Sequence, residues 1–121
     1  MSGLNRVILL GNLGADPELR AVGETHVLGV RLATSESFKD RSGERQERTE
    51  WHRVNIWGKR GEALARFLKK GDRVLVEGSI RTSTYEKDGE TKYSTEILAY
   101  NIVLSGSGKT QQEEHDDEFQ I

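Results

Sequence analysis

The chain has 121 residues, a length that fits one domain, and its 18 basic and 20 acidic residues leave a net charge of −2. It contains no cysteine, which excludes disulfides, thiolate metal ligands and cysteine nucleophiles. The sequence holds neither an apolar run long enough to span a membrane nor a leader for secretion, so we expect a cytoplasmic protein.

The charge is divided unevenly along the chain. Residues 105–121 hold one lysine and five acidic residues, whereas the residues before them hold 17 basic and 15 acidic ones. A mildly basic body with an acidic tail indicates an interaction tail and an anionic partner.

The first third of the chain reads as strands joined by glycine turns. The stretch RVILLG (6–11) predicts a first strand that is apolar on both faces, so one face can fill a barrel interior while the other needs a cover. The GNLG turn (11–14) is too common to indicate a function by itself. A second strand is expected over residues 25–38, where apolar residues alternate, and the charged segment 39–48 predicts a mobile loop.

The segment TEWHRVNIWG contains the only two tryptophans of the chain, Trp51 and Trp57. Their spacing of six is even, so on a strand both indoles emerge from the same face. Val54 and Ile56 fall on the opposite face and suit a core. The indoles then point outward together with Arg53, where either a partner covers them or they form a working surface.

The hydrophobic period changes after this strand. Leu64, Phe67 and Leu68 recur at helical spacing, which predicts a short amphipathic helix over residues 59–70 that ends at Gly71. Two further strands follow. They are expected over residues 73–85, with a bend at Gly78, and over residues 91–104, with Asp88-Gly89 as the hairpin turn between them.

Five strands with one short helix between the third and the fourth is the element order of an OB-fold, a five-stranded Greek-key barrel. A closed barrel of this kind also removes open sheet edges. The sequence therefore predicts an all-β OB-fold domain over residues 1–104, followed by a short flexible linker and an acidic tail over residues 105–121.

Aromatic rings alternate with basic residues in the predicted strands. The sets are Phe38 with Lys39 and Arg41, Trp51 and Trp57 with Arg53, and Tyr85 with Arg81. Unpaired bases stack on rings without regard to sequence, and cations follow the phosphates, so these sets predict binding of single-stranded nucleic acid. The alternative is that some of the rings are core or oligomer contacts.

The segment SGSGKT (105–110) contains the end of a phosphate-binding loop, but the full pattern needs a glycine where Val103 stands and a helix after it. A linker explains the segment better. The three histidines show no metal-ligand spacing, and no Ser/His/Asp set can be picked out. The sequence therefore predicts a protein that is not an enzyme and needs no metal or cofactor.

The chain ends in EEHDDEFQI, where two apolar residues follow an acidic run. Acidic residues with apolar anchors suit docking of a short peptide into a basic-rimmed hydrophobic pocket, whereas the alternative is an inert disordered tail. The predicted partner-binding residues are Asp116, Asp117, Glu118, Phe119, Gln120 and Ile121.

The sequence resembles one known family, that of bacterial single-stranded DNA-binding protein (SSB). The matching stretches, in family order over residues 4–104, are NRVILLGNLGADPELR, LATSESF, TEWHRVNIWGK, LKKGDRVLVEGSIRT and then the acidic terminus. The resemblance implies an OB-fold, a homotetramer, and sequence-independent binding and protection of single-stranded DNA during replication, recombination and repair. It also implies that replication and repair proteins dock on the C-terminal tail.

The resemblance assigns roles by position. Phe38 stands where the family usually has a DNA-stacking tryptophan, Trp51 matches such a tryptophan, and Trp57 replaces a phenylalanine. Tyr85 matches a further aromatic position. The basic positions similar to those of the family are Arg6, Arg20, Arg53, Lys59, Lys70 and Arg81.

The chain also departs from the family. Thr82, Ser83 and Thr84 stand where further basic residues often follow Arg81, which implies a lower affinity or a weaker salt dependence. The linker is short, and the tip reads DDEFQI in place of aspartates followed by Ile-Pro-Phe. Two other functions stay open: an OB module that binds protein or RNA, and a nucleotide-using enzyme built on GSGKT.

Overall fold

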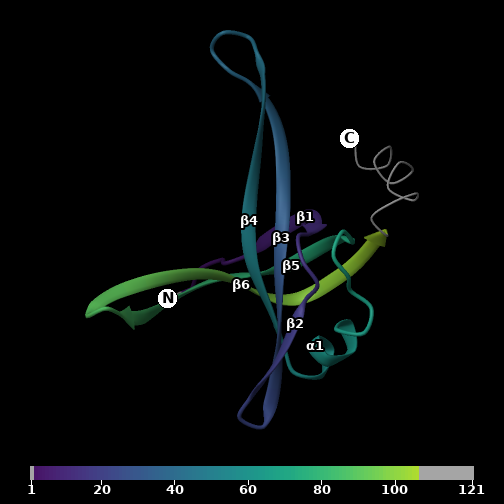
Figure 1. The fold of residues 1–121 in the computed structure, drawn as a ribbon, viewed down its shortest axis with the longest axis vertical. Coiled ribbons are helices and arrows are strands. Elements are labelled where there is room, and N and C mark those ends of the chain that lie inside the picture. The colour runs from purple at the N-terminus through teal and green to yellow at the C-terminus, as the bar shows by residue number, and fades with distance from the viewer. Residues whose placement is uncertain (1, 107–121) are drawn as a thin grey trace.

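The computed structural model describes residues 2–106, which form six strands and one short helix (Figure 1). In chain order they are β1 (Val7–Leu13), β2 (Glu18–Val22), β3 (Thr25–Lys39), β4 (Arg45–Trp57), α1 (Lys59–Leu64), β5 (Arg73–Lys87) and β6 (Glu90–Gly106). The tail residues 116–121, predicted to bind partner proteins, lie outside the described residues. None of the helical structure described here is long and apolar enough to cross a membrane.

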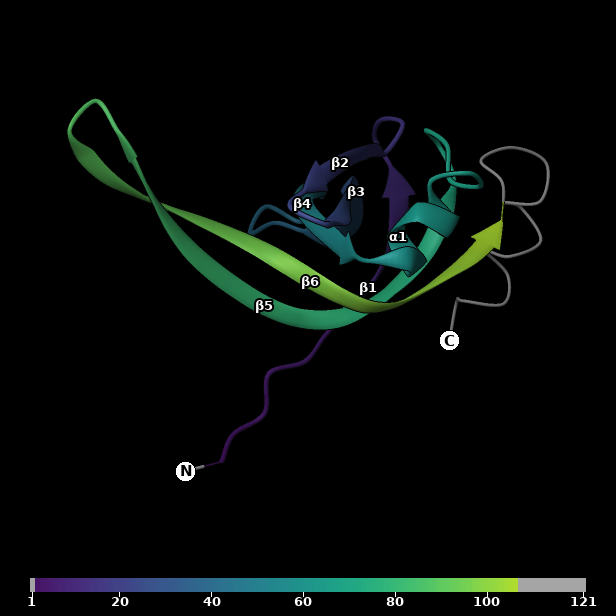
Figure 2. The same ribbon diagram turned by 90° about the horizontal axis from the view of Figure 1, so that it is seen from below.

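Five of the strands close into a barrel. The hydrogen-bonded order is β1-β5-β6-β4-β3-β2, and β1 pairs again with β3, so the sheet closes on itself while β2 extends it from β3. β4 and β6 run parallel and the other neighbours run antiparallel. In Figure 2, β5 and β6 curve along one side of this barrel. The predicted OB-fold, with a short helix between the third and fourth barrel strands, is confirmed.

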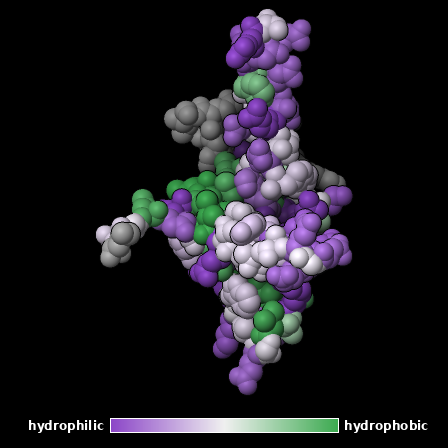
Figure 3. Space-filling view, turned by 90° about the vertical axis from the view of Figure 1, so that its left-hand side faces the viewer, coloured by the Kyte–Doolittle hydropathy of each residue, from purple (hydrophilic) through white to green (hydrophobic). Residues whose placement is uncertain are grey.

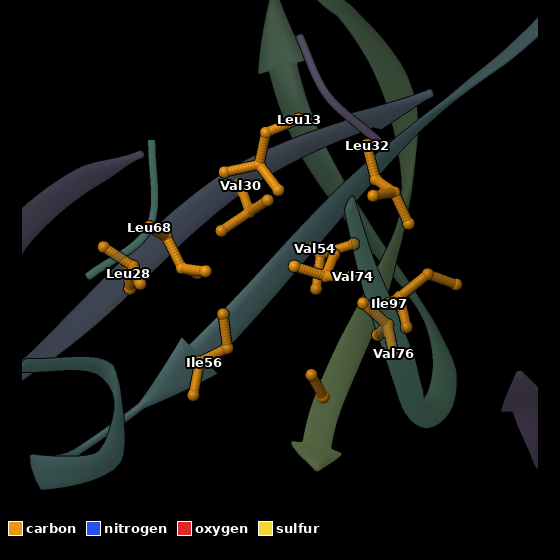
Figure 4. Close-up of a cluster of buried hydrophobic side chains, with 11 residues drawn as sticks. Leu13, Leu28, Val30, Leu32, Val54, Ile56, Leu68, Val74, Val76 and Ile97 are labelled. Carbon is orange, nitrogen blue, oxygen red and sulfur yellow. The ribbon is translucent and has the colours of Figure 1, made fainter. Parts of the chain in front are cut away.

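The core follows from the alternation of apolar side chains along the strands. Within the barrel, alternate residues of β3, β4 and β5 point inward, and burying each of these valines, leucines or isoleucines stabilises the fold by about 1.5–3 kcal/mol. Figure 4 shows the cluster. Its buried members are Leu13, Leu28, Val30, Leu32, Val54, Ile56, Leu68, Val74, Val76, Ile97 and Ala99.

Two glycines let strands approach closely where the barrel closes and bends. A Cβ at Gly11 would lie 2.2 Å from the carbonyl oxygen of Ala33, and one at Gly78 would lie 2.3 Å from that of Leu98. The β5–β6 register shifts between Glu77 and Gly78, so the predicted bend in this strand is confirmed.

The predicted hairpin turn is also confirmed. Asp88 and Gly89 have φ angles of 55° and 77°, the left-handed pair that a two-residue type I′ turn requires. This turn joins two strands that extend well beyond the barrel as a curved ribbon, which we call the arm (residues 81–96) (Figure 2).

The helix predicted over residues 59–70 is wrong in extent, because α1 ends at Leu64. The Asp72 carboxylate accepts a hydrogen bond from the Lys69 amide at 2.9 Å, a local bond that competes with helical pairing. Leu68 is buried as expected, but Phe67 is 64% exposed and does not join the core.

The loop predicted over residues 39–48 is also wrong in extent, because only residues 40–44 lie outside the strands. β3 and β4 pair in register up to Lys39 and Arg45, forming a hairpin that we call the finger (residues 34–50), which rises from the barrel in Figure 1. At its tip the Asp40 carboxylate accepts hydrogen bonds from the amides of Glu44 and Ser42, each at 2.9 Å. The bond from Glu44 contributes most to holding the pKa of Asp40 below its ordinary value.

Candidate nucleic-acid interface

Both tryptophans lie on the outer face of β4. Trp51 is 54% and Trp57 46% exposed, whereas Val54 and Ile56, between them on the opposite face, are buried. The pairing of β4 with β3 keeps this alternation fixed over the whole strand. The indoles are therefore open surface, as their even spacing predicts, and the barrel does not enclose them.

The Trp51 ring lies directly on backbone. A Cβ at Gly14 would be 2.2 Å from Cζ3 and 2.6 Å from Cη2 of the indole, so only glycine leaves room for the ring there. The Gly14 amide donates a hydrogen bond to the Arg31 carbonyl at 2.9 Å, and the Arg31 guanidinium carbon lies 5.2 Å from the ring centroid. Trp51 is thus held in one position by a glycine on its edge and a cation on its face.

Three hollows lie side by side on this outer face. The Trp51 hollow, of about 350 Å³, is lined among others by Trp51, Arg31, Arg53, Tyr85 and Tyr93. A middle hollow of about 440 Å³ shares Arg31 and Arg53 with it. The Trp57 hollow, of about 520 Å³, shares Asn55 and Glu96 with the middle one. Through these shared residues the three hollows form one continuous surface, which we call the groove.

Positive charge is concentrated at the Trp51 end of the groove, whose hollow is lined by two arginines and no acidic residue, whereas three arginines and three acidic residues line the middle hollow. Arg31 and Arg53 stand directly opposite each other on β3 and β4, an arrangement of like charges that destabilises a sheet unless an anion compensates it. Arg20 also lines the middle hollow, as does Asp16, whose carboxylate accepts a hydrogen bond from the Lys70 amide at 2.8 Å. Exposed rings beside paired arginines suit unpaired bases and their phosphates.

Comparison with known proteins identifies the family. The model described as "Single-strand binding protein family" matches residues 4–105. The chain belongs to the single-strand binding protein family. The resemblance read from the sequence is therefore confirmed.

Curated members of the single-strand binding protein family are close in sequence. Single-stranded DNA-binding protein 1 of Chlorobaculum tepidum is 48% identical over 109 residues, which cover 87% of this chain and 67% of that protein. The single-stranded DNA-binding protein of Xanthomonas campestris pv. campestris is 47% identical over 110 residues, which cover 88% of this chain and 64% of that protein. The chain thus spans about two thirds of the length of these relatives.

Solved structures of the family share the fold. The Plasmodium falciparum SSB in complex with ssDNA matches with a TM-score of 0.80 and 30% identity, covering 86% of this chain and 96% of that one. A deletion mutant of the Thermus aquaticus single-stranded DNA binding protein matches with a TM-score of 0.76 and 36% identity, covering 84% of this chain and 50% of that one. The family and these relatives are binding proteins, which confirms that the chain is not an enzyme.

The structure brings only part of the predicted site together. Trp51, Trp57 and Tyr85 line the groove. Phe38 is exposed on the finger, with the Arg48 guanidinium 4.9 Å from its ring, and it lies on the opposite face of the hairpin from Trp51. Of the predicted phosphate contacts, those lining the groove are Arg20, Arg53 and Arg81.

The other predicted phosphate contacts do not line the three hollows. Lys39 ends β3 and Arg41 belongs to the turn at the tip of the finger, beyond Phe38. Lys59 begins α1, and Lys70 belongs to the turn before β5. Arg6 donates a hydrogen bond to Glu77 at 2.9 Å, on the side where β1, β5 and β6 pair.

That side, which we call the second face, is formed by outward residues of β1, β5 and β6. Ile8, Leu10, Leu75 and Val103 share it through the strand register, and Ile8 is 59% exposed. Figure 3 shows a concentration of apolar residues on the side of the molecule that carries the N-terminus. Glu77 lies among them, and hydrogen bonds from Asn101 and then Arg6 hold its pKa below the ordinary value.

Several groove residues escaped the sequence analysis. Gly14 belongs to a two-glycine turn that has no distinctive pattern. Arg31 alternates with buried residues of its strand and so faces outward, but it has no aromatic neighbour in the sequence. Tyr93 and Tyr100 lie on β6, where the sequence analysis singled out no surface. Strand parity could have identified Arg31, but only the packing of the strands shows the other three.

His52 faces the interior side of β4. Its Nε2 lies 2.9 Å from the hydroxyl of Thr34, which gives the ring a structural partner across the finger base. Among the residues that the structure describes, no group of three or more histidines, aspartates or glutamates is placed to hold a metal ion.

Proposed function

We propose that this chain binds single-stranded DNA without regard to its sequence. The observation that supports this most is the pair of exposed indoles on β4, one beneath an arginine, along one continuous groove in a member of the single-strand binding protein family. Each base stacked on a ring contributes roughly 1–3 kcal/mol, irrespective of the base. The relatives named above carry single-stranded DNA binding in their names, which supports the same conclusion.

Within this proposal the rings and cations have separate tasks. Trp51, Trp57 and Tyr85 stack bases along the groove. Phe38 stacks a base outside the groove, on the other face of the finger and beside Arg48. Arg20, Arg53 and Arg81 hold phosphates beside the rings. The proposed contacts outside the groove are Arg6, Lys39, Arg41, Lys59 and Lys70.

We also propose that copies of the chain assemble through the second face, as a homotetramer. Its apolar side chains are exposed in a single chain, and burying them against another copy gains roughly 25 cal/mol per Å². Assembly would join several grooves, so that one strand of DNA wraps over more than one copy. Sedimentation at micromolar concentration tests this: a stable monomer would reject it.

The remaining part of the proposal concerns residues 105–121. Since β6 reaches Gly106, the linker and the acidic tail start at residue 107 in this proposal. Replication, recombination and repair proteins dock on the tail, in the cytoplasm at the replication fork. The charge of this segment, one lysine against five acidic residues, suits a basic-rimmed pocket on a partner. A chain ending after Gln112 should lose binding to such a protein, and retained binding would contradict the proposal.

A fluorescence titration tests the central claim. Oligo(dT) is added to the full chain at about 50 mM and about 200 mM salt, and the same is done with oligo(rU) and with duplex DNA. We expect deep quenching of tryptophan by oligo(dT), weaker binding at the higher salt, and little binding of duplex. Unquenched tryptophans would reject base stacking, and equal binding of duplex would favour an unspecific polyanion site.

A further inference from the structure

The Trp57 hollow contains a second aromatic ring that no part of the proposed function uses. Asn55 on β4 and Leu98 on β6 form the last residue pair of the parallel ladder between these strands. Two residues further along each strand stand Trp57 and Tyr100, and both line the same hollow. Tyr100 is the extra residue of β6 at the register shift opposite Glu77 and Gly78, so its place in the hollow comes from this bulge and not from regular alternation. Beyond Asn55 and Leu98 no ladder pair joins β4 and β6. Trp57 on β4 and Tyr100 on β6 line the open hollow of about 520 Å³ that lies there.

The backbone on both sides of this hollow is held by the protein itself. The Gly58 amide, next to Trp57, donates a hydrogen bond to the His26 carbonyl at 2.8 Å. On the other side, the guanidinium of Arg60 donates to the carbonyl of Tyr100. The two rings therefore have fixed attachment points before any ligand arrives, which lowers the ordering cost of binding.

The lining of the hollow fits a planar ring with polar edges. Tyr100 is 50% exposed, Trp57 is nearly as open, and Leu98 supplies apolar surface between them. Polar groups surround this apolar part: they belong to Asn55, Ser79, Arg81, Ser83 and Glu96. Rings take the face of a base, while hydroxyl, amide and charged groups suit its edge and the adjoining phosphate.

We propose that Tyr100 is a further base-binding residue, which together with Trp57 holds one unpaired nucleobase in the Trp57 hollow. The hollow joins the rest of the groove through Asn55 and Glu96, so a strand that follows the groove reaches it. This inference rests on the proposed function, since it assigns one more ring to the same DNA path. Tyr100 lies 43 positions after Trp57 in the sequence, and only the β4–β6 pairing brings them together.

The test uses a chain with a single tryptophan. Trp51→Phe leaves Trp57 as the only indole, so its fluorescence reports the Trp57 hollow alone. Tyr100→Leu is then compared with Tyr100→Phe in this background, using oligo(dT) of about ten nucleotides, within the length that one OB-fold covers. Phe67→Leu is the matched control, because Phe67 is an exposed ring outside the groove.

We expect Tyr100→Leu to weaken binding about 5- to 150-fold and to reduce the DNA-induced quenching of Trp57. Tyr100→Phe, which keeps the ring, and Phe67→Leu should both bind like the background chain. Thermal unfolding of each variant shows whether the fold is intact. If Tyr100→Leu weakens binding only because the variant is partly unfolded at the temperature of the titration, the inference is overturned.

Two outcomes separate this inference from the proposed function. If Tyr100→Leu binds and quenches as the background does, while Trp51→Leu in the full chain weakens binding, Tyr100 has no role and the proposed function stands. If the unmodified chain fails to bind oligo(dT), both fall together. Equal weakening by Tyr100→Leu and Tyr100→Phe would place the effect in the hydroxyl and would overturn base stacking on this ring.

Discussion

The two ends of the groove set their tryptophans in different surroundings, although both indoles belong to one face of β4. At the Trp51 end the ring lies on Gly14 under the guanidinium of Arg31, in a hollow whose lining is mostly polar. At the Trp57 end the lining is mostly apolar and includes a second ring, Tyr100.

The two ends of the groove also differ in their charged residues. Arg31 and Arg53 oppose each other near Trp51, whereas Arg81 near Trp57 stands opposite Glu96. Excess positive charge therefore lies at one end, and apolar ring surface at the other. We infer that the Trp51 end contributes most of the salt-dependent part of DNA binding, while the Trp57 end contributes mainly stacking, which salt screens little.

Gly14→Val disturbs the Trp51 end of the groove alone and should have the largest effect on DNA affinity. The new side chain needs space that the indole fills, so the ring must leave its place beside Arg31. We expect oligo(dT) binding to weaken by about 1–3 kcal/mol, the value of one stacked base, while part of the total tryptophan quenching remains because Trp57 still stacks. A titration followed by tryptophan fluorescence measures both.

Gly3→Ala is the control for that variant, because a Cβ at Gly3 meets no atom within 4 Å. Gly14→Val keeps the amide that bonds to the Arg31 carbonyl, so the barrel should remain folded. Unchanged affinity together with an intact melting curve would show that the position of Trp51 does not matter for binding.

Arg31→Met and Arg81→Met sharpen the comparison through smaller effects. Loss of one phosphate contact on single-stranded DNA lowers the slope of log K against log salt by about 0.7. We expect that change for Arg31→Met and a smaller one for Arg81→Met, because Glu96 already offsets the charge of Arg81. Titrations at several salt concentrations give the slopes.

The free energy of unfolding should change in opposite directions in Arg31→Met and Arg81→Met. Arg31→Met removes a like-charge pair across β3 and β4 and should raise the free energy of unfolding by about 0.2–1 kcal/mol. Arg81→Met leaves Glu96 without its opposite charge across β5 and β6 and should lower it slightly. Equal slopes and equal stabilities for the two variants would refute the division between the two ends.

Errors of sequence reading occurred where long-range pairing changed local structure. The segment 39–48 is charged and contains a glycine, which is typical of a loop, yet register with the facing strand extends β3 and β4 almost to the turn at Asp40. The helix after Trp57 was expected to be longer because Leu64, Phe67 and Leu68 have helical spacing. After Leu64 the amides of Arg66 and Phe67 bond to carbonyls three residues back, so the chain continues as turns and not as a regular α-helix.

The sequence by itself determined what short-range rules specify: the faces of the strands, the outward direction of Trp51 and Trp57, the turn at Asp88-Gly89 and the bend at Gly78. These follow from side-chain alternation and glycine backbone freedom, which act between neighbours in the chain. Tertiary structure alone decided that Gly14 lies under Trp51 and that Tyr100 lies across from Trp57. Alternation fixes the face of a side chain, but which strands meet depends on how the whole barrel closes around its core.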